Sequence, residues 1–170
     1  MSKKQGDSPY DERDLTVVHY SRRLVVPVPV GETFAYLSRF SSAAEWDPGV
    51  RSARMLTPSP VGLGSVFALD AVFMGNTVPL RYEITDFDPP NRVVLTAENA
   101  SVRSTDHISF ARDPSGSTVV QYDADLALKG VARVAAPLFA LAFRRIGDRA
   151  SDGLLATLSA RSPRPLGGQW

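Results

Sequence analysis

Apolar and polar residues alternate along much of the chain, and a period of two is typical of β-strands with one buried face. In residues 77–87, for example, Leu80 and Tyr82 share one face while Arg81 and Glu83 share the other. Seven segments are predicted strands on this basis: residues 15–28, 50–56, 65–73, 77–87, 92–98, 102–112 and 117–128. Their spacing predicts an antiparallel meander with one face on a core and the other toward water.

Turn sequences separate these strands. Proline stands beside small or turn-forming polar residues in three segments, 57–60, 88–91 and 113–116. Gly75 and Asn76 favour a hairpin bend, because such dipeptides tolerate positive φ. Pro27 and Pro29 end the first strand, because proline cannot donate to a sheet ladder.

Two short helices are predicted between the first two strands. Residues 31–40 place Phe34 and Leu37 on one helical face. A second helix begins after Ser41 or Ser42, and Ser42 and Glu45 have the spacing of a capping box. Asp47-Pro48-Gly49 ends it.

The last element is a long helix over residues 131–158. Its apolar stripe has helical period and consists of Phe139, Phe143, Ile146, Ala150, Leu154 and Leu158. Pro137 either opens the main helix or kinks it. Gly147 and Gly153 each weaken a helix by up to ~1 kcal/mol relative to alanine, which indicates close packing or a bend.

This combination of elements predicts an interior hollow. A helix is ~10 Å across and strands lie ~4.8 Å apart, so one helix cannot cover a sheet of six or seven strands unless the sheet curls around it. We therefore expect an elongated apolar cavity between sheet and helix. Aromatic side chains are the alternative filling: Phe67, Phe73, Tyr82, Phe110, Tyr122, Phe139 and Phe143.

Composition narrows the class of protein. The 170 residues are 44% hydrophobic and 22% charged with a net charge of +1, which favours one globular domain over a disordered chain and gives no support for nucleic-acid binding. Cysteine is absent and histidine occurs twice, so thiol chemistry is excluded and neither a metal site nor a cofactor is predicted.

We expect a flexible leader at 1–14, a single domain at 15–160 and a flexible tail at 161–170 in which Trp170 either docks or is loose. No secretory signal is recognised, the longest apolar stretch is too short for a bilayer, and a cytoplasmic location is expected.

Several motifs resemble the START-like, helix-grip superfamily of Bet v 1-type allergens, START lipid-transfer domains and bacterial polyketide cyclases/dehydrases. They are VPVPVGETFAYLSRF, Trp46-Asp47-Pro48-Gly49-Val50, Gly64-Ser65, and Tyr122 to Gly130 leading to Pro137. The resemblance spans about residues 17–158. It implies an α+β helix-grip fold in which a curved, seven-stranded antiparallel sheet wraps around the long C-terminal helix. It also implies an apolar cavity with Trp46 at its mouth, and it implies no particular reaction.

Asp106 is the main candidate for chemistry. Strict alternation turns it inward with Ser104 and Ile108. A buried carboxyl tends to be neutral near neutral pH, where it serves as an acid or base or holds a ligand hydroxyl. Alternatively, a bulge moves it to the rim, or Tyr82 or Tyr122 satisfies it.

Tyr82 and Tyr122 are the candidate catalytic partners of Asp106, with core packing as their other interpretation. The predicted ligand-binding residues line the inner faces: Trp46, Phe67, Leu69, Phe73, Leu80, Tyr82, Ser104, Asp106, Ile108, Phe110, Tyr122, Phe139, Phe143 and Ile146. His107 is predicted to face solvent.

Arginine placement bears on the cyclase interpretation. The resembling aromatase/cyclases carry an arginine inside the cavity, whereas Arg81 and Arg103 are predicted outside. On the last helix, Arg144 and Asp148 have i,i+4 spacing and predict a solvated face.

Three functions remain open. The first is a binding protein for a small apolar or amphipathic molecule of lipid, polyketide or aromatic type, without membrane insertion. The second is a cyclase- or dehydratase-type enzyme that uses Asp106, Tyr82 and Tyr122. The third is a regulatory protein-interaction module. A homodimer is left open.

Overall fold

The computed structural model describes residues 16–161, except for the side chains of 131–133. The predicted leader, the tail after Arg161 and Trp170 lie outside the described residues. The strands are β1 (Thr16–Val26), β2 (Val50–Met55), β3 (Val66–Phe73), β4 (Asn76–Asp88), β5 (Arg92–Glu98), β6 (Val102–Arg112) and β7 (Thr118–Leu128). The helices are α1 (Val30–Ser38), η2 (Phe40–Ser42), α2 (Ala43–Trp46), η3 (Gly130–Ala135) and α3 (Ala136–Arg161).

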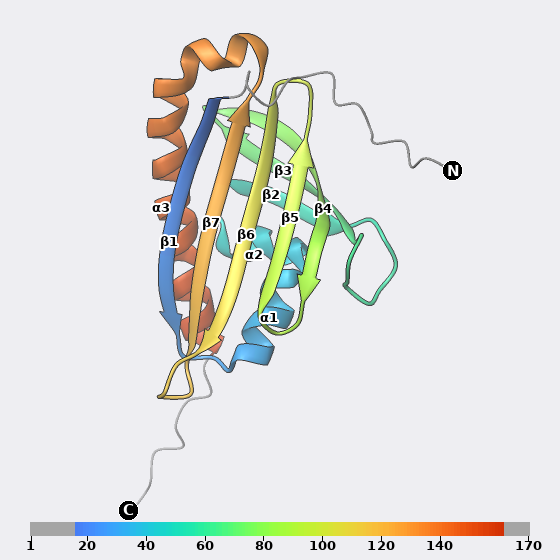
Figure 1. Ribbon diagram of the computed structural model, residues 1–170, viewed down its shortest axis with the longest axis vertical. Helices are drawn as coiled ribbons and strands as arrows, with labels where there is room; N and C mark the ends of the chain where they lie inside the picture. The colour runs from blue at the N-terminus through green and yellow to red at the C-terminus, as the bar shows by residue number, and fades with distance from the viewer. Residues whose placement is uncertain (1–15, 162–170) are drawn as a thin grey trace, which may run out of the picture.

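The seven strands form one antiparallel sheet in the order β1-β7-β6-β5-β4-β3-β2. Figure 1 shows the sheet curving, with α3 running beside β1, α1 near the lower end of the sheet in this view and α2 about halfway along it. The predicted helix-grip architecture is thereby confirmed. No helix within residues 16–161 combines the length and apolarity needed to cross a bilayer.

The alternation of side chains sets the two faces of the sheet. On β6, Ser104, Asp106 and Ile108 are buried, whereas His107 is exposed. The register shifts once on β4, between Ile84 and Asp86. That irregularity lies in the pairing of β4 with β5, whereas β6 pairs with β5 and β7 in continuous register, so the expected inward position of Asp106 holds.

Helix α3 is attached unevenly along its length. Its buried side chains, Ser151, Leu154 and Leu158, all lie in its second half. There Leu154 and Leu158 join the main core with Trp46. The first half meets a smaller cluster, in which Phe139 and Phe143 pack against Val18, Leu126 and Leu128.

Both glycines of α3 mark close contacts. A Cβ on Gly153 would stand 2.0 Å from the backbone oxygen of Trp46, and one on Gly147 would stand 2.7 Å from the ring of Tyr20. The prediction of close packing at these glycines is confirmed. Pro137 stands in the first turn of α3, so it opens the main helix.

Two local predictions were wrong. The β3–β4 hairpin turns at Met74 and Gly75, both at positive φ, because Asn76 already pairs with Phe73. The capping box at α2 does not form. The hydroxyl of Ser42 donates to the carbonyl of Tyr36, and Glu45 accepts from the Tyr36 hydroxyl.

Candidate functional site

Asp106 lies at the centre of β6, on the inner face of the sheet. Its neighbours across the ladder are Leu95 on β5 and Ala124 on β7. The side chain is buried, with 5% of its surface exposed. Alanine at position 124 is small, so the backbone register itself leaves room on one side of the carboxyl group.

The two tyrosines predicted beside Asp106 are brought together with it. The Tyr122 hydroxyl donates to Oδ1 of Asp106 at 3.0 Å. The Tyr82 hydroxyl donates to the Ser104 hydroxyl at 3.1 Å. Tyr82 and Ser104 reach each other across β5 because both pair with the small residue Ala97.

One oxygen of the carboxyl group is left without a partner. Oδ2 of Asp106 is buried and accepts no hydrogen bond from any described residue. A buried acceptor without a donor costs about 1–3 kcal/mol. The prediction that a tyrosine satisfies Asp106 therefore holds for Oδ1 alone.

Burial sets the acidity of this cluster. Desolvation raises the pKa of Asp106 to about 6, and the hydroxyls of Tyr122 and Tyr82 oppose that rise. Burial, together with the nearby Asp106 charge, raises the pKa of both tyrosines well above its ordinary value. At neutral pH the two phenols are therefore protonated donors, and the carboxyl group is close to its own titration range.

Asp47 is a neighbour that the sequence analysis treated only as a helix breaker. Burial raises its pKa, which the backbone N–H of Gly49, donating to Oδ1 at 2.7 Å, partly offsets. Its charge also raises the pKa of Asp106. The signal in the sequence that could have identified Asp47 was a carboxyl group directly after a short buried helix. The proximity of Asp47 to Asp106, however, depends on the fold.

Trp46 holds α2 against the site. Its indole N–H donates to the Ser42 hydroxyl at 3.3 Å, and its ring meets that of Tyr122 edge to face at 6.3 Å. The side chain is buried. Its packing role is thus directly visible, and contact with a ligand stays a prediction.

Five of the predicted ligand-binding residues are apolar and only partly buried. They are Phe73, Leu80, Phe139, Phe143 and Ile146. The rings of Phe73 on β3 and Phe139 on α3 stack at 5.0 Å across the space between sheet and helix. This contact brings together two of the aromatic side chains that were predicted as the alternative filling of the interior.

The remaining apolar residues predicted for the site lie deeper. Phe67, Leu69, Ile108 and Phe110 are buried in the main core. Phe110 packs edge to face on Phe34. These four side chains are therefore part of the packed core of the protein.

The charged side chains considered for the site lie outside it. Arg81 and His107 are exposed, and Arg103 pairs with Glu98 at 3.1 Å. His19 binds Asp125 at 2.6 Å, and both side chains are substantially exposed.

The pair predicted between Arg144 and Asp148 does not form, although Arg144 lies on an exposed face as expected. Among residues 16–161 no ion pair joins them. Asp148 instead accepts from the Tyr20 hydroxyl at 3.1 Å and lies 3.8 Å from Arg22, because α3 packs along β1.

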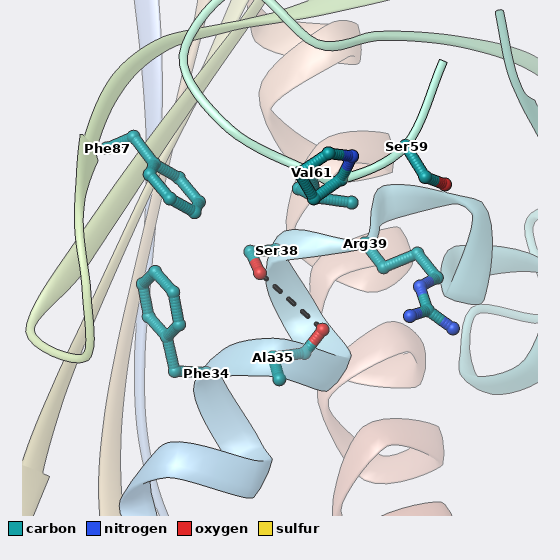
Figure 2. Close-up of a pocket in the computed structure, with 8 residues that line it drawn as sticks. Phe34, Ala35, Ser38, Arg39, Ser59, Val61 and Phe87 are labelled. Atoms are coloured by element: carbon teal, nitrogen blue, oxygen red, sulfur yellow. Dashed lines mark hydrogen bonds between the residues drawn. The ribbon is translucent and has the colours of Figure 1, made fainter. Parts of the chain in front are cut away.

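Two surface hollows occur elsewhere, around α1. The first measures about 320 Å³, and Figure 2 shows Phe34 and Phe87 on one side of it with Val61 opposite. The second, about 360 Å³, is lined by Tyr36, Glu45 and Arg161 among others. Neither is lined by any residue predicted for the interior site. Sequence alone could not predict them, because the first joins residues 34–39, 59–61 and 87 and the second joins residues 35–45 to Arg161.

Comparisons with known proteins agree with the fold described above. The family model for polyketide cyclase / dehydrase and lipid transport matches residues 17–162. No curated protein matches the chain.

Solved structures share the fold at low identity. The Zhui aromatase/cyclase from Streptomyces sp. R1128 aligns with a TM-score of 0.73 at 14% identity, covering 91% of this chain and 100% of its own. A START superfamily protein from Mycobacterium smegmatis gives 0.66 at 16%, covering 85% and 96%. Ginseng major latex-like protein 151 from Panax ginseng gives 0.63 at 11%, covering 84% and 97%. Because the family match spans most of its length, the chain belongs to the polyketide cyclase / dehydrase and lipid transport family.

Proposed function

We propose that this protein binds a small apolar or amphipathic molecule between the sheet and the first half of α3. The observation that carries the proposal is Oδ2 of Asp106, a buried acceptor without a donor. Native proteins satisfy most buried polar atoms, and the exceptions often mark sites where something else binds. Asp106 therefore supplies the polar end of the proposed site.

The apolar part of the proposed site comes from side chains that folding leaves half buried. Leu80 and Phe73 on the sheet and Phe139 and Phe143 on α3 retain accessible surface although they lie on inner faces. Mostly apolar walls with a few convergent polar groups are typical of small-molecule sites. The family to which the chain belongs supports the same interpretation.

A pair of variants on β4 tests this proposal. We expect the neutral apolar fluorophore N-phenyl-1-naphthylamine to bind saturably, with calorimetry giving the stoichiometry. Leu80→Trp should abolish binding by filling the interior, whereas Glu83→Trp, on the exposed outer face, should leave it unchanged. Equal binding by both variants, or no saturable binding to the unmodified protein, contradicts the proposal.

A second function, a cyclase- or dehydratase-type enzyme, is favoured by a specific observation. The pKa of Asp106 is raised to about 6, and the Tyr122 phenol lies 3.0 Å from it. A carboxyl near its titration point beside neutral phenols is suited to general acid–base catalysis. The Zhui aromatase/cyclase shares this fold.

The enzyme alternative is tested by turnover. Asp106→Asn should reduce ring closure or dehydration of an aromatic polyketide substrate by at least about a hundredfold, the usual contribution of a proton-transfer group. Undiminished turnover removes Asp106 from the reaction.

A further inference from the structure

We infer that the molecule bound at Asp106 is neutral and presents a hydroxyl group, phenolic or alcoholic, to Oδ2 of Asp106 and the hydroxyl of Ser104. This inference rests on the proposed function and names the chemical class that the site selects. It follows from an inventory of donors and acceptors on the inner face of β6.

The first group to consider is a hydrogen-bond acceptor, Oδ2 of Asp106. Tyr122 occupies Oδ1 of Asp106, and Oδ2 has no donor among the described residues. An ionised carboxyl oxygen only accepts hydrogen bonds. The group opposite it must therefore carry a hydrogen.

The second group is a donor. The Ser104 oxygen accepts from the Tyr82 hydroxyl at 3.1 Å, so the Ser104 hydrogen is directed elsewhere. Ser104 and Asp106 alternate on one strand and share its buried face. A hydroxyl group is the smallest group that donates to Asp106 and accepts from Ser104 at once.

Charge disfavours one competitor, and hydrogen-bonding capacity disfavours the other. A carboxylate would meet Asp106 and the nearby Asp47 without a cation to offset them, because every described arginine is exposed or, as with Arg103, paired on the outer face. Buried Lys129 binds Glu98 and the backbone oxygen of Asn99 at the end of β7. An ammonium group would satisfy Asp106 but offers Ser104 no acceptor.

The sheet register provides room for such a group. Ala124 stands directly beside Asp106, and Ala97 stands directly beside Ser104. Both are alanines on the inner face with little side-chain volume. Ala124 is therefore the small neighbour of Asp106, with Leu95 on the other side, whereas Tyr82 reaches Ser104 across Ala97.

Three matched probes test the inference by displacement of the neutral fluorophore N-phenyl-1-naphthylamine near neutral pH: 2-naphthol, 2-naphthoate and 2-naphthylmethylammonium. We expect 2-naphthol to bind at least about tenfold more tightly than either charged probe, which corresponds to one well-placed hydrogen bond. Ser104→Ala should remove most of that preference. Its control is Ser109→Ala, the same change on the exposed face of β6, which should have no effect.

Asp106→Asn supplies a second, independent readout. It removes the negative charge, so 2-naphthoate should gain affinity while 2-naphthol loses it. Equal affinities, or tightest binding by 2-naphthoate or 2-naphthylmethylammonium, overturn the hydroxyl assignment while leaving interior binding intact. Failure of N-phenyl-1-naphthylamine itself to bind the unmodified protein overturns the proposed function and this inference together.

Discussion

The two halves of α3 differ in how they are attached to the rest of the protein. In the second half, Leu154 and Leu158 are buried in the main core, and Gly153 lets the helix touch the backbone of Trp46. In the first half no described side chain is fully buried, and Leu138 and Leu141 are each 52% exposed. One helix therefore combines a firmly packed segment with a loosely packed one.

The difference shows that a single helix can hold a fold together through one half while its other half stays loosely packed. Buried apolar contacts largely set the free energy of local opening, so the first half should open at lower cost than the second. Phe139 and Phe143, which face the interior, belong to that first half. The closely packed half of α3 therefore lies beside α2, and the loosely packed half lies against β1 and the end of β7.

Gly153→Ala should cause the largest loss of stability. The new Cβ would stand 2.0 Å from the Trp46 carbonyl oxygen, a backbone atom that cannot rotate away. Overpacking typically costs about 1–3 kcal/mol, and we expect about 3 kcal/mol here because backbone must move. Denaturant unfolding measures the change.

The matched control for Gly153→Ala is Gly31→Ala. Gly31 also lies in a helix, α1, but a Cβ there would meet nothing within 4 Å. It should be neutral or should stabilise by up to about 1 kcal/mol through helix propensity. Equal losses at both sites would mean that α3 does not touch α2 closely.

Asp106→Asn should change how stability depends on pH. Because the folded pKa of about 6 exceeds the ordinary 3.8, the folded state binds the proton more tightly and Asp106 lowers stability as pH rises through this interval. The cost is absent below about pH 4 and complete above about pH 6, where it reaches about 3 kcal/mol. The variant lacks this dependence.

The measurement for Asp106→Asn is the difference in unfolding free energy between variant and unmodified protein across this pH range. It should shift by about 3 kcal/mol in favour of the variant from low to neutral pH. A constant difference would place Asp106 in water rather than under α3.

Much of this arrangement was accessible from sequence, and the reason is periodicity. Alternation along β6 correctly turned Asp106 inward and His107 outward, because a strand has a strict period of two. Alternation along one strand does not say which residues of other strands lie alongside. Two such positions depend on register and on the curvature of the sheet: that of Asp47 near Asp106, and that of Ala97 between Tyr82 and Ser104.

Local signals also failed where tertiary contacts competed with them. Ser42 and Glu45 have capping-box spacing, yet Ser42 bonds Tyr36 and Trp46, and Glu45 bonds Tyr36 and Arg161. Those contacts fix α2 against α1 and α3. The uneven attachment of α3 was likewise hidden, because its apolar stripe continues through both halves.

Gly147→Ala should have an intermediate effect. The new Cβ would meet the Tyr20 ring at 2.7 Å, and a side-chain ring can shift where a backbone carbonyl cannot. The shift would disturb the bonds from Tyr20 to Asp148 and Ser151, so we expect a net loss of about 1 kcal/mol. In a Tyr20→Ala background the same change should cost nothing, and a persistent cost in that double mutant would remove Tyr20 from the explanation.

Leu141→Ala should have the smallest effect and is the most direct test of the loosely packed half. Leu141 is 52% exposed, so its truncation should change the unfolding free energy by less than about 0.5 kcal/mol. Leu154→Ala, the same change at a side chain that is 1% exposed, should cost about 3 kcal/mol because it leaves a cavity in the core. Comparable losses at the two positions would mean that α3 is packed evenly, and the proposed access to Asp106 beneath its first half would then lose its structural basis.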